Sequence, residues 1–146
     1  MKASRYFTQE QQKQIVEAIE AAELNTSGEI RVHIDSVCKE NNVLDRAAKM
    51  FALLKMHKTA LRNGVLIYLS VDDHKFAIIG DSGINAKVPA NFWENTKNIM
   101  LTNLKEGKIV DALAEGITLA GEQLKLFFPY KLDDVNELDN SISFEK

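Results

Sequence analysis

Residues 64–85 read GVLIYLSVDDHKFAIIGDSGIN, and this stretch decides the fold. Its first part, residues 64–71, is an almost unbroken apolar run rich in β-branched and aromatic residues, which predicts a strand buried on both faces. The polar pair Asp72-Asp73 separates this run from residues 74–79, so we expect the two runs to form an antiparallel hairpin. The stretch ends in a glycine-flanked acidic loop at residues 80–83.

The chain before this hairpin predicts a helix, a strand and a second helix. Thr8 and Gln11 form a capping box, and apolar residues recur at helical spacing to about residue 23. Residues 29–35 alternate strictly between apolar and polar, which predicts a strand with one face in water, the face that carries His33 and Asp35. A helix capped by Asn41 or Asn42 follows and is expected to end near residue 57.

Two further helices are expected after the hairpin, over residues 89–107 and 109–127, which gives the order αβαββαα. A right-handed crossover places the first strand parallel to the second, and the hairpin places the third strand on the other side of the second. We therefore predict an α/β fold, a three-layer α/β/α sandwich with a small mixed sheet in which the second strand is central.

Composition and charge bound the organisation of the chain. Its 146 residues suit one domain, which we place at residues 1–130. Residues 131–146 hold five acids and two lysines, which accounts for the whole net charge of −3, and they lack an apolar pattern, so we expect a mobile acidic tail. The rest of the chain is nearly neutral, and this argues against nucleic acid as a partner.

The compartment is predicted from what the sequence lacks. No apolar run approaches the roughly 18 residues of a membrane span, and the N-terminus has no apolar signal region, so no membrane anchor is expected. A single cysteine, Cys38, cannot form an internal disulfide, which fits a reducing compartment. These features predict a cytoplasmic protein.

Three polar loops are expected to meet at one end of the sheet, because the first two strands begin there and the antiparallel third strand ends there. They are residues 27–29, 62–64 and 80–85, and each pairs a glycine with a side chain that offers oxygen or charge. Glu29, Asn63, Asp81 and Ser82 are therefore candidate oxygen ligands for a hard cation, Ca²⁺ or Mg²⁺. The alternative is ordinary turn and helix-cap chemistry at the same residues.

The same loops offer a candidate catalytic pair. Arg62 presents a guanidinium fork for phosphate, and Asp81 would hold the metal, which together make a minimal phosphoester-hydrolysing site. The alternative is that Arg62 is a solvated loop residue. His33 with Asp35 is a third candidate, for an enzyme without metal, and its alternative is a salt-bridged surface.

Several of these segments resemble the TPM domain, a family named for a thylakoid lumen protein, a photosystem II repair protein and a nematode receptor modulator. The resemblance covers about residues 5–129. Its motifs are SGEIRV at 27–32, RNGVLI at 62–67, FAIIGDSGI at 76–84, Phe92-Trp93, and Phe128-Pro129 after the last helix.

The resemblance implies an α/β/α sandwich, divalent-cation binding in a cleft beside the sheet and, for some relatives, acid phosphatase activity. Asn85 stands where many relatives have a glutamate, so Asp81 would have to substitute for that acid. We expect a TPM-like domain that binds Ca²⁺ or Mg²⁺, with weak phosphatase activity on a small phosphoester. The alternative is a non-catalytic interaction or regulatory module that contacts a protein partner.

Overall fold

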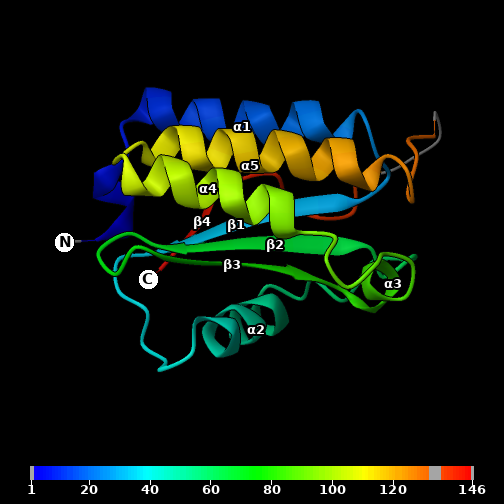
Figure 1. The fold of residues 1–146 in the computed structure, drawn as a ribbon, viewed down its shortest axis with the longest axis horizontal. Coiled ribbons are helices and arrows are strands. Elements are labelled where there is room, and N and C mark those ends of the chain that lie inside the picture. Colours follow the sequence, from blue (N-terminus) through cyan, green and yellow to red (C-terminus); the bar gives the residue numbers. More distant parts are fainter. Residues whose placement is uncertain (1, 132–135, 146) are drawn as a thin grey trace.

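A computed structural model describes residues 2–131 and 136–145. Figure 1 shows three layers, with the sheet in the middle. The helices α1 (Gln9–Glu23), α4 (Glu94–Lys105) and α5 (Ile109–Leu124) cover one face of the sheet, and α2 (Val43–Leu53) covers the other. The predicted α/β sandwich is confirmed. No helix in the described part of the chain is long and apolar enough to span a membrane.

The sheet has the strand order β3-β2-β1-β4. Its strands are β1 (Glu29–Asp35), β2 (Gly64–Ser70), β3 (Lys75–Gly80) and β4 (Ser143–Phe144). The strand β2 pairs parallel with β1 and antiparallel with β3, as the apolar run and the acidic turn predicted. Every residue of β2 is buried, because its side chains enter two separate cores on opposite faces of the sheet.

The helix ends follow local backbone chemistry. The capping box of Thr8 and Gln11 is present, and Asn42 caps α2 by accepting a hydrogen bond from the N–H of Leu44. The helix α2 ends four residues before the expected end near 57, and Lys55 then adopts a left-handed backbone, with φ of 55°. The other predicted helices are confirmed with shorter ends, and two short helices were not predicted: η1 (Ala3–Tyr6) and α3 (Ser82–Asn85).

The expectation that one face of β1 is exposed to solvent is wrong. His33 and Asp35 are each only 1% exposed, and Glu29 is 4% exposed. The reason is that α2 packs under β2 and β3 on this side, while residues 136–145 run along the outer edge of β1 (Figure 1). An alternating pattern therefore marks a polar buried face here and not a solvated one.

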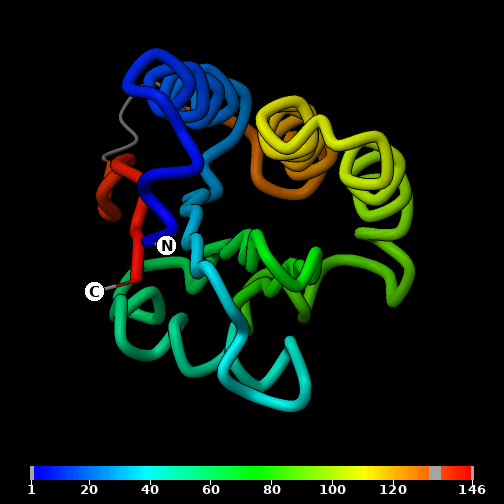
Figure 2. Tube along the Cα trace, turned by 90° about the vertical axis from the view of Figure 1, so that its left-hand side faces the viewer, coloured from blue at the N-terminus to red at the C-terminus, as the bar shows by residue number. Residues whose placement is uncertain are grey.

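Residues 136–145 differ from the tail that composition predicted. They add β4 in parallel to β1, with His33 opposite Ser143 and Ile34 opposite Phe144. In Figure 2 this segment lies beside the N-terminal segment, and the N–H of Ala3 donates to Oε1 of Glu145 at 3.1 Å. Residues 132–135, which hold two of the five acids of the tail, lie outside the described residues. A domain boundary at residue 130 stays a prediction.

Candidate functional site

The three polar loops do meet at one end of the sheet. Glu29 pairs with Gly64 at the start of the two parallel strands, and Val65 pairs with Gly80 at the end of β3. The side chains of the loops nevertheless separate into two sites, since Asp81 binds Arg62 of the neighbouring loop and Glu29 lines a cleft beside α1.

The first site is an ion pair between Asp81 and Arg62. The guanidinium donates from Nε to Oδ2 at 2.7 Å and from Nη2 to Oδ1 at 2.8 Å, while the N–H of Ser82 donates to Oδ1 at 2.7 Å. Burial alone would raise the pKa of Asp81, but the hydrogen bonds from Arg62 and Ser82 outweigh it and lower that pKa. Asp81 is therefore a carboxylate with both oxygens engaged.

The backbone around Asp81 closes this site further. Residues Ser82–Asn85 form the short helix α3, which Asp81 caps, and the N–H of Gly83 donates to the carbonyl of Arg62 at 2.8 Å. A Cβ at Gly83 would lie 2.1 Å from the carbonyl oxygen of Leu61, so the two loops approach as closely as glycine allows. We call this contact between loops 62–64 and 80–85 the Asp81 clasp.

Asn63 ties the first two loops together. Its amide Nδ2 donates to the carbonyl of Ser27 at 3.0 Å, and its carbonyl accepts from the N–H of Glu29 at 3.1 Å. The Oδ1 atom of Asn63 is buried and has no hydrogen-bond partner among the described residues. The predicted set of Glu29, Asn63, Asp81 and Ser82 is thus not brought together around one point: Glu29 contacts Asn63, and Asp81 contacts Ser82.

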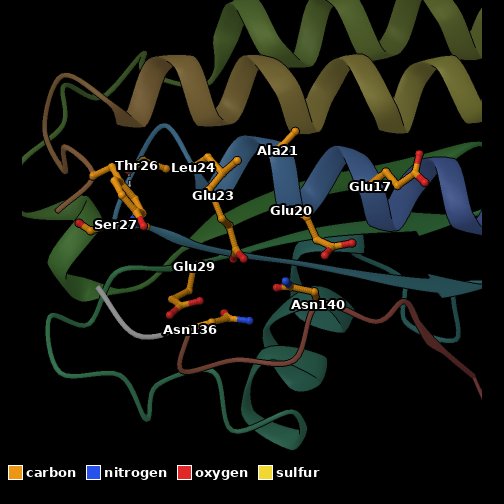
Figure 3. Close-up of a pocket in the computed structure, with 12 residues that line it drawn as sticks. Glu17, Glu20, Ala21, Glu23, Leu24, Thr26, Ser27, Glu29, Asn136 and Asn140 are labelled. Atoms are coloured by element: carbon orange, nitrogen blue, oxygen red, sulfur yellow. Dashed lines mark hydrogen bonds between the residues drawn. The ribbon is translucent and has the colours of Figure 1, made fainter. Parts of the chain in front are cut away.

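The second site is a cleft of about 570 Å³ between α1 and the C-terminal segment (Figure 3). Glu20 and Glu23 extend from α1 toward a space that Glu29, Asn136 and Asn140 border from the sheet and the C-terminal segment. The remaining lining comes from both ends of the cleft: Glu17, Ala21, Leu24, Thr26, Ser27, Gly28 and Tyr130.

Two carboxyl groups in this cleft, those of Glu23 and Glu29, each accept a hydrogen bond from the backbone through one oxygen. Oε2 of Glu23 accepts from the N–H of Ile30 at 2.9 Å, and Oε1 of Glu29 accepts from the N–H of Glu137 at 2.6 Å. Oε2 of Glu29 and Oδ1 of Asn140 are buried and accept no hydrogen bond from a donor in the described residues. A buried acceptor without a donor lowers the stability of the fold, so a bound cation or proton in this cleft would be stabilising.

The two carboxyl groups also repel each other. Burial is the main cause that raises the pKa of Glu23 to about 8, and the neighbouring Glu29 raises it further. Burial likewise raises the pKa of Glu29, although hydrogen bonds from Glu137 and Glu23 oppose the change. In the metal-free cleft both carboxyl groups therefore resist ionisation, and the raised pKa of Glu23 lets it keep a proton at neutral pH.

The chemistry of this donor set fits a hard cation. Two carboxyl groups and the side-chain oxygens of Asn136 and Asn140 are the kinds of oxygen that Ca²⁺ and Mg²⁺ prefer. No group of three or more His, Cys, Asp or Glu side chains within residues 2–131 and 136–145 is arranged to hold a metal, so amide oxygens and water would complete the shell. Glu23, Asn136 and Asn140 were missed from sequence, although Glu23 ends the helix just before β1.

A third polar group lies at the far end of β1. Oδ2 of Asp35 accepts from Tyr68 Oη at 2.6 Å and from Arg46 Nε at 2.8 Å, and His33 Nε2 lies 2.7 Å from Oδ1. His33 Nδ1 lies 2.8 Å from Oγ of Ser143. Burial opposes ionisation of Asp35, but the hydrogen bonds from His33, Arg46 and Tyr68 outweigh it and hold the pKa of Asp35 far below its usual range. This network is closed and buried.

Known proteins with this fold support a family assignment. The chain is similar to the BA42 protein from the psychrophilic bacterium Bizionia argentinensis, with 48% identity over 97% of each chain and a TM-score of 0.90. A domain of a Porphyromonas gingivalis protein shares the fold at 16% identity, covering 86% of this chain and 82% of that one, with a TM-score of 0.70.

The N-terminal domain of cg2496 from Corynebacterium glutamicum shares the fold at 12% identity, covering 98% of this chain and 83% of that one, with a TM-score of 0.61. None of the curated proteins compared with the chain matches it. The model of the TPM domain matches residues 1–123. Given this match over most of its length, the chain belongs to the TPM domain family.

Proposed function

We propose that this TPM domain is a Ca²⁺-binding module whose carboxylate ligands are Glu29 and Glu23. The observation that carries the proposal is Oε2 of Glu29, an acceptor in a side chain only 4% exposed that receives no hydrogen bond from a donor among the described residues. A cation would bring both carboxyl groups to the charged state, and the proton on Glu23 would leave as it binds.

Calcium suits this cleft better than magnesium. Magnesium demands six close ligands in near-ideal octahedral geometry, whereas calcium accepts irregular shells of carboxylate and amide oxygens. Glu17 and Glu20 in the lining of the cleft are exposed, and its amides at Asn136 and Asn140 belong to a different segment from its carboxyl groups. Such a mixed set from α1, β1 and the C-terminal segment favours the more adaptable ion.

Phosphoester hydrolysis, which the family resemblance implies for some relatives, has less support in this chain. Arg62 and Asp81 engage each other in a two-point ion pair, so phosphate binding by Arg62 requires that pair to open. Asp81 also lies outside the cleft where the carboxyl groups gather. The geometry therefore favours a non-catalytic binding module, and metal-dependent hydrolysis of p-nitrophenyl phosphate that Asp81→Asn abolishes would restore the catalytic assignment.

Isothermal titration with Ca²⁺ tests the proposal on two matched variants. Glu29→Gln and Asp81→Asn each replace one carboxylate by an amide of the same shape. We expect Glu29→Gln to weaken binding at least about a hundredfold, because removal of a carboxylate ligand lowers the charge that tunes affinity for this ion. Asp81→Asn should bind like the unmodified protein. Binding lost in Asp81→Asn and kept in Glu29→Gln would overturn the proposal.

A further inference from the structure

The C-terminal segment forms part of the wall of the Glu29 cleft. We call residues 136–145 the strap. Asn136 and Asn140 line the cleft from the strap, and the N–H of Glu137 donates to Oε1 of Glu29 at 2.6 Å. A strap that moved away from the sheet would therefore remove the backbone donors of Glu137 and Leu138 from this carboxylate, together with both amides.

The strap is also held by residues whose side chains do not line the cleft. Leu138 is 8% exposed and belongs to the core on the α2 side of the sheet, next to Met56 and Leu66. Further along, the N–H of Glu145 donates to the carbonyl of Ile34 at 3.1 Å, and Oγ of Ser143 lies 2.8 Å from the ring of His33. These anchors can be altered without touching the lining of the cleft.

The docked strap leaves two acceptors without donors. Oε2 of Glu29 and Oδ1 of Asn140 are buried with the strap in place, and neither has a partner among the described residues. An undocked strap would let water reach both atoms, so docking carries a desolvation cost in the metal-free protein. A cation coordinated by both oxygens removes that desolvation cost, and it can do so only in the docked state.

We propose that the strap completes the cation site, so that Ca²⁺ binding at Glu29 and docking of the strap on β1 stabilise each other. The inference rests on the proposed function, because it needs Ca²⁺ at Glu29. Its physical basis is differential binding: the docked strap offers Asn136, Asn140 and an ordered Glu29, and the undocked strap offers none of them. Linkage then requires the effect to be equal in both directions.

Amide hydrogen exchange of the full-length chain, measured by NMR with and without saturating Ca²⁺, tests one direction. The N–H of Glu145 reports docking through its bond to Ile34, and the N–H of Gly83 reports the unrelated Asp81 clasp. We expect exchange at Glu145 to slow about tenfold or more when the cation binds, since only docked chains are bound. Exchange at Gly83 should change far less.

The effect of strap docking on Ca²⁺ affinity is tested by substitutions at residues that anchor the strap but do not line the cleft. Leu138→Ala removes the apolar anchor, and Leu53→Ala makes the same change at a leucine that is 69% exposed. We expect Leu138→Ala to weaken Ca²⁺ binding about tenfold, because a smaller docked fraction lowers apparent affinity in proportion, and Leu53→Ala to leave it within about twofold. Ser143→Ala, which removes only the contact with His33, should weaken binding about threefold by the same relation and guards against misfolding of the larger change.

The outcomes separate the two proposals. Ca²⁺ binding that needs Glu29, with unchanged exchange at Glu145 and unchanged affinity in Leu138→Ala and Ser143→Ala, would overturn the strap and leave the proposed function standing. No Ca²⁺ binding to the unmodified chain would overturn both. Slower exchange at Glu145 together with weaker binding in the two anchor variants supports the strap as a component of the site.

Discussion

The two ends of β1 carry carboxylates that are buried to nearly the same degree and satisfied very differently. Asp35, at the last residue of the strand, is 1% exposed and accepts hydrogen bonds from His33, Arg46 and Tyr68. Glu29, at the first residue, is 4% exposed and has one oxygen without any donor from the described residues. The two side chains are buried almost equally, and they differ in the number of hydrogen-bond donors that contact them.

This difference separates a structural carboxylate from a candidate ligand. Asp35 has its positive partner built into α2, so nothing further is needed to balance its charge. Asp81 belongs with Asp35, because Arg62 and the N–H of Ser82 engage both of its oxygens. Glu29 faces a second acid instead of a base, and its charge awaits a proton or a cation.

Asp35→Asn should give the largest effect on stability. The change leaves Arg46 with no anionic partner and turns an amide N–H₂ toward donors, so we expect a loss of about 3 kcal/mol in the free energy of unfolding. Urea denaturation measures it. A loss no greater than that of the shape-matched Glu29→Gln would contradict the distinction between the two ends of β1.

Gly83→Ala should be next, because the Asp81 clasp has no room for a side chain. The new Cβ would meet the carbonyl oxygen of Leu61 at 2.1 Å, and backbone must shift, so we expect a loss of about 2 kcal/mol. Ser82→Ala in the same short helix is an exposed control, expected to lie within about 0.5 kcal/mol of the original protein. Ca²⁺ affinity should be unchanged in both, and weaker binding in folded Gly83→Ala would place the ion at Asp81.

The pH dependence of stability should reveal the acid pair at Glu29. Folded Glu23 keeps its proton to about pH 8, whereas the unfolded chain releases it near 4.5, so rising pH between these values favours unfolding. We expect metal-free protein in chelator to lose at least about 1 kcal/mol between pH 5 and pH 8, because each unit of pKa shift is worth about 1.4 kcal/mol and solvent at the open cleft screens part of the shift. Glu23→Gln should remove this slope, and an equal slope in that variant would assign it elsewhere.

Glu29→Gln should have the smallest effect on the metal-free protein. The amide relieves repulsion with Glu23 and keeps an acceptor for the N–H of Glu137, so we expect a change within about 1 kcal/mol, neutral or stabilising. Thermal unfolding in chelator and in Ca²⁺ measures both states. A strong destabilisation in chelator would mean that Glu29 is a structural carboxylate like Asp35.

The sequence predicted the fold well because its signals are local. The apolar run at residues 64–70, the acidic turn and the capping box at Thr8 each determine their element without help from distant residues. The burial of β1 could not be predicted in the same way. A polar alternate face indicates solvent unless α2 and residues 136–145 are known to cover it, and both contacts are made by residues far along the chain.

The candidate site was predicted only in outline. Strand directions brought the three loops to one end of the sheet, which the structure confirms. Strand direction does not say which way a side chain points, so the sequence grouped Glu29 with Asp81 and missed Glu23. The assignments of Ca²⁺ or Mg²⁺ and of catalysis stay predictions, as does the protein partner.

NMR titration of the uniformly labelled chain with Ca²⁺ tests the central claim most directly, because one experiment reports on both acidic sites. We expect chemical-shift changes that saturate together at Glu23, at residues 27–29, and at Asn136 and Asn140, with little change at residues 80–85. Changes confined to residues 80–85, or none anywhere at millimolar Ca²⁺, would contradict it.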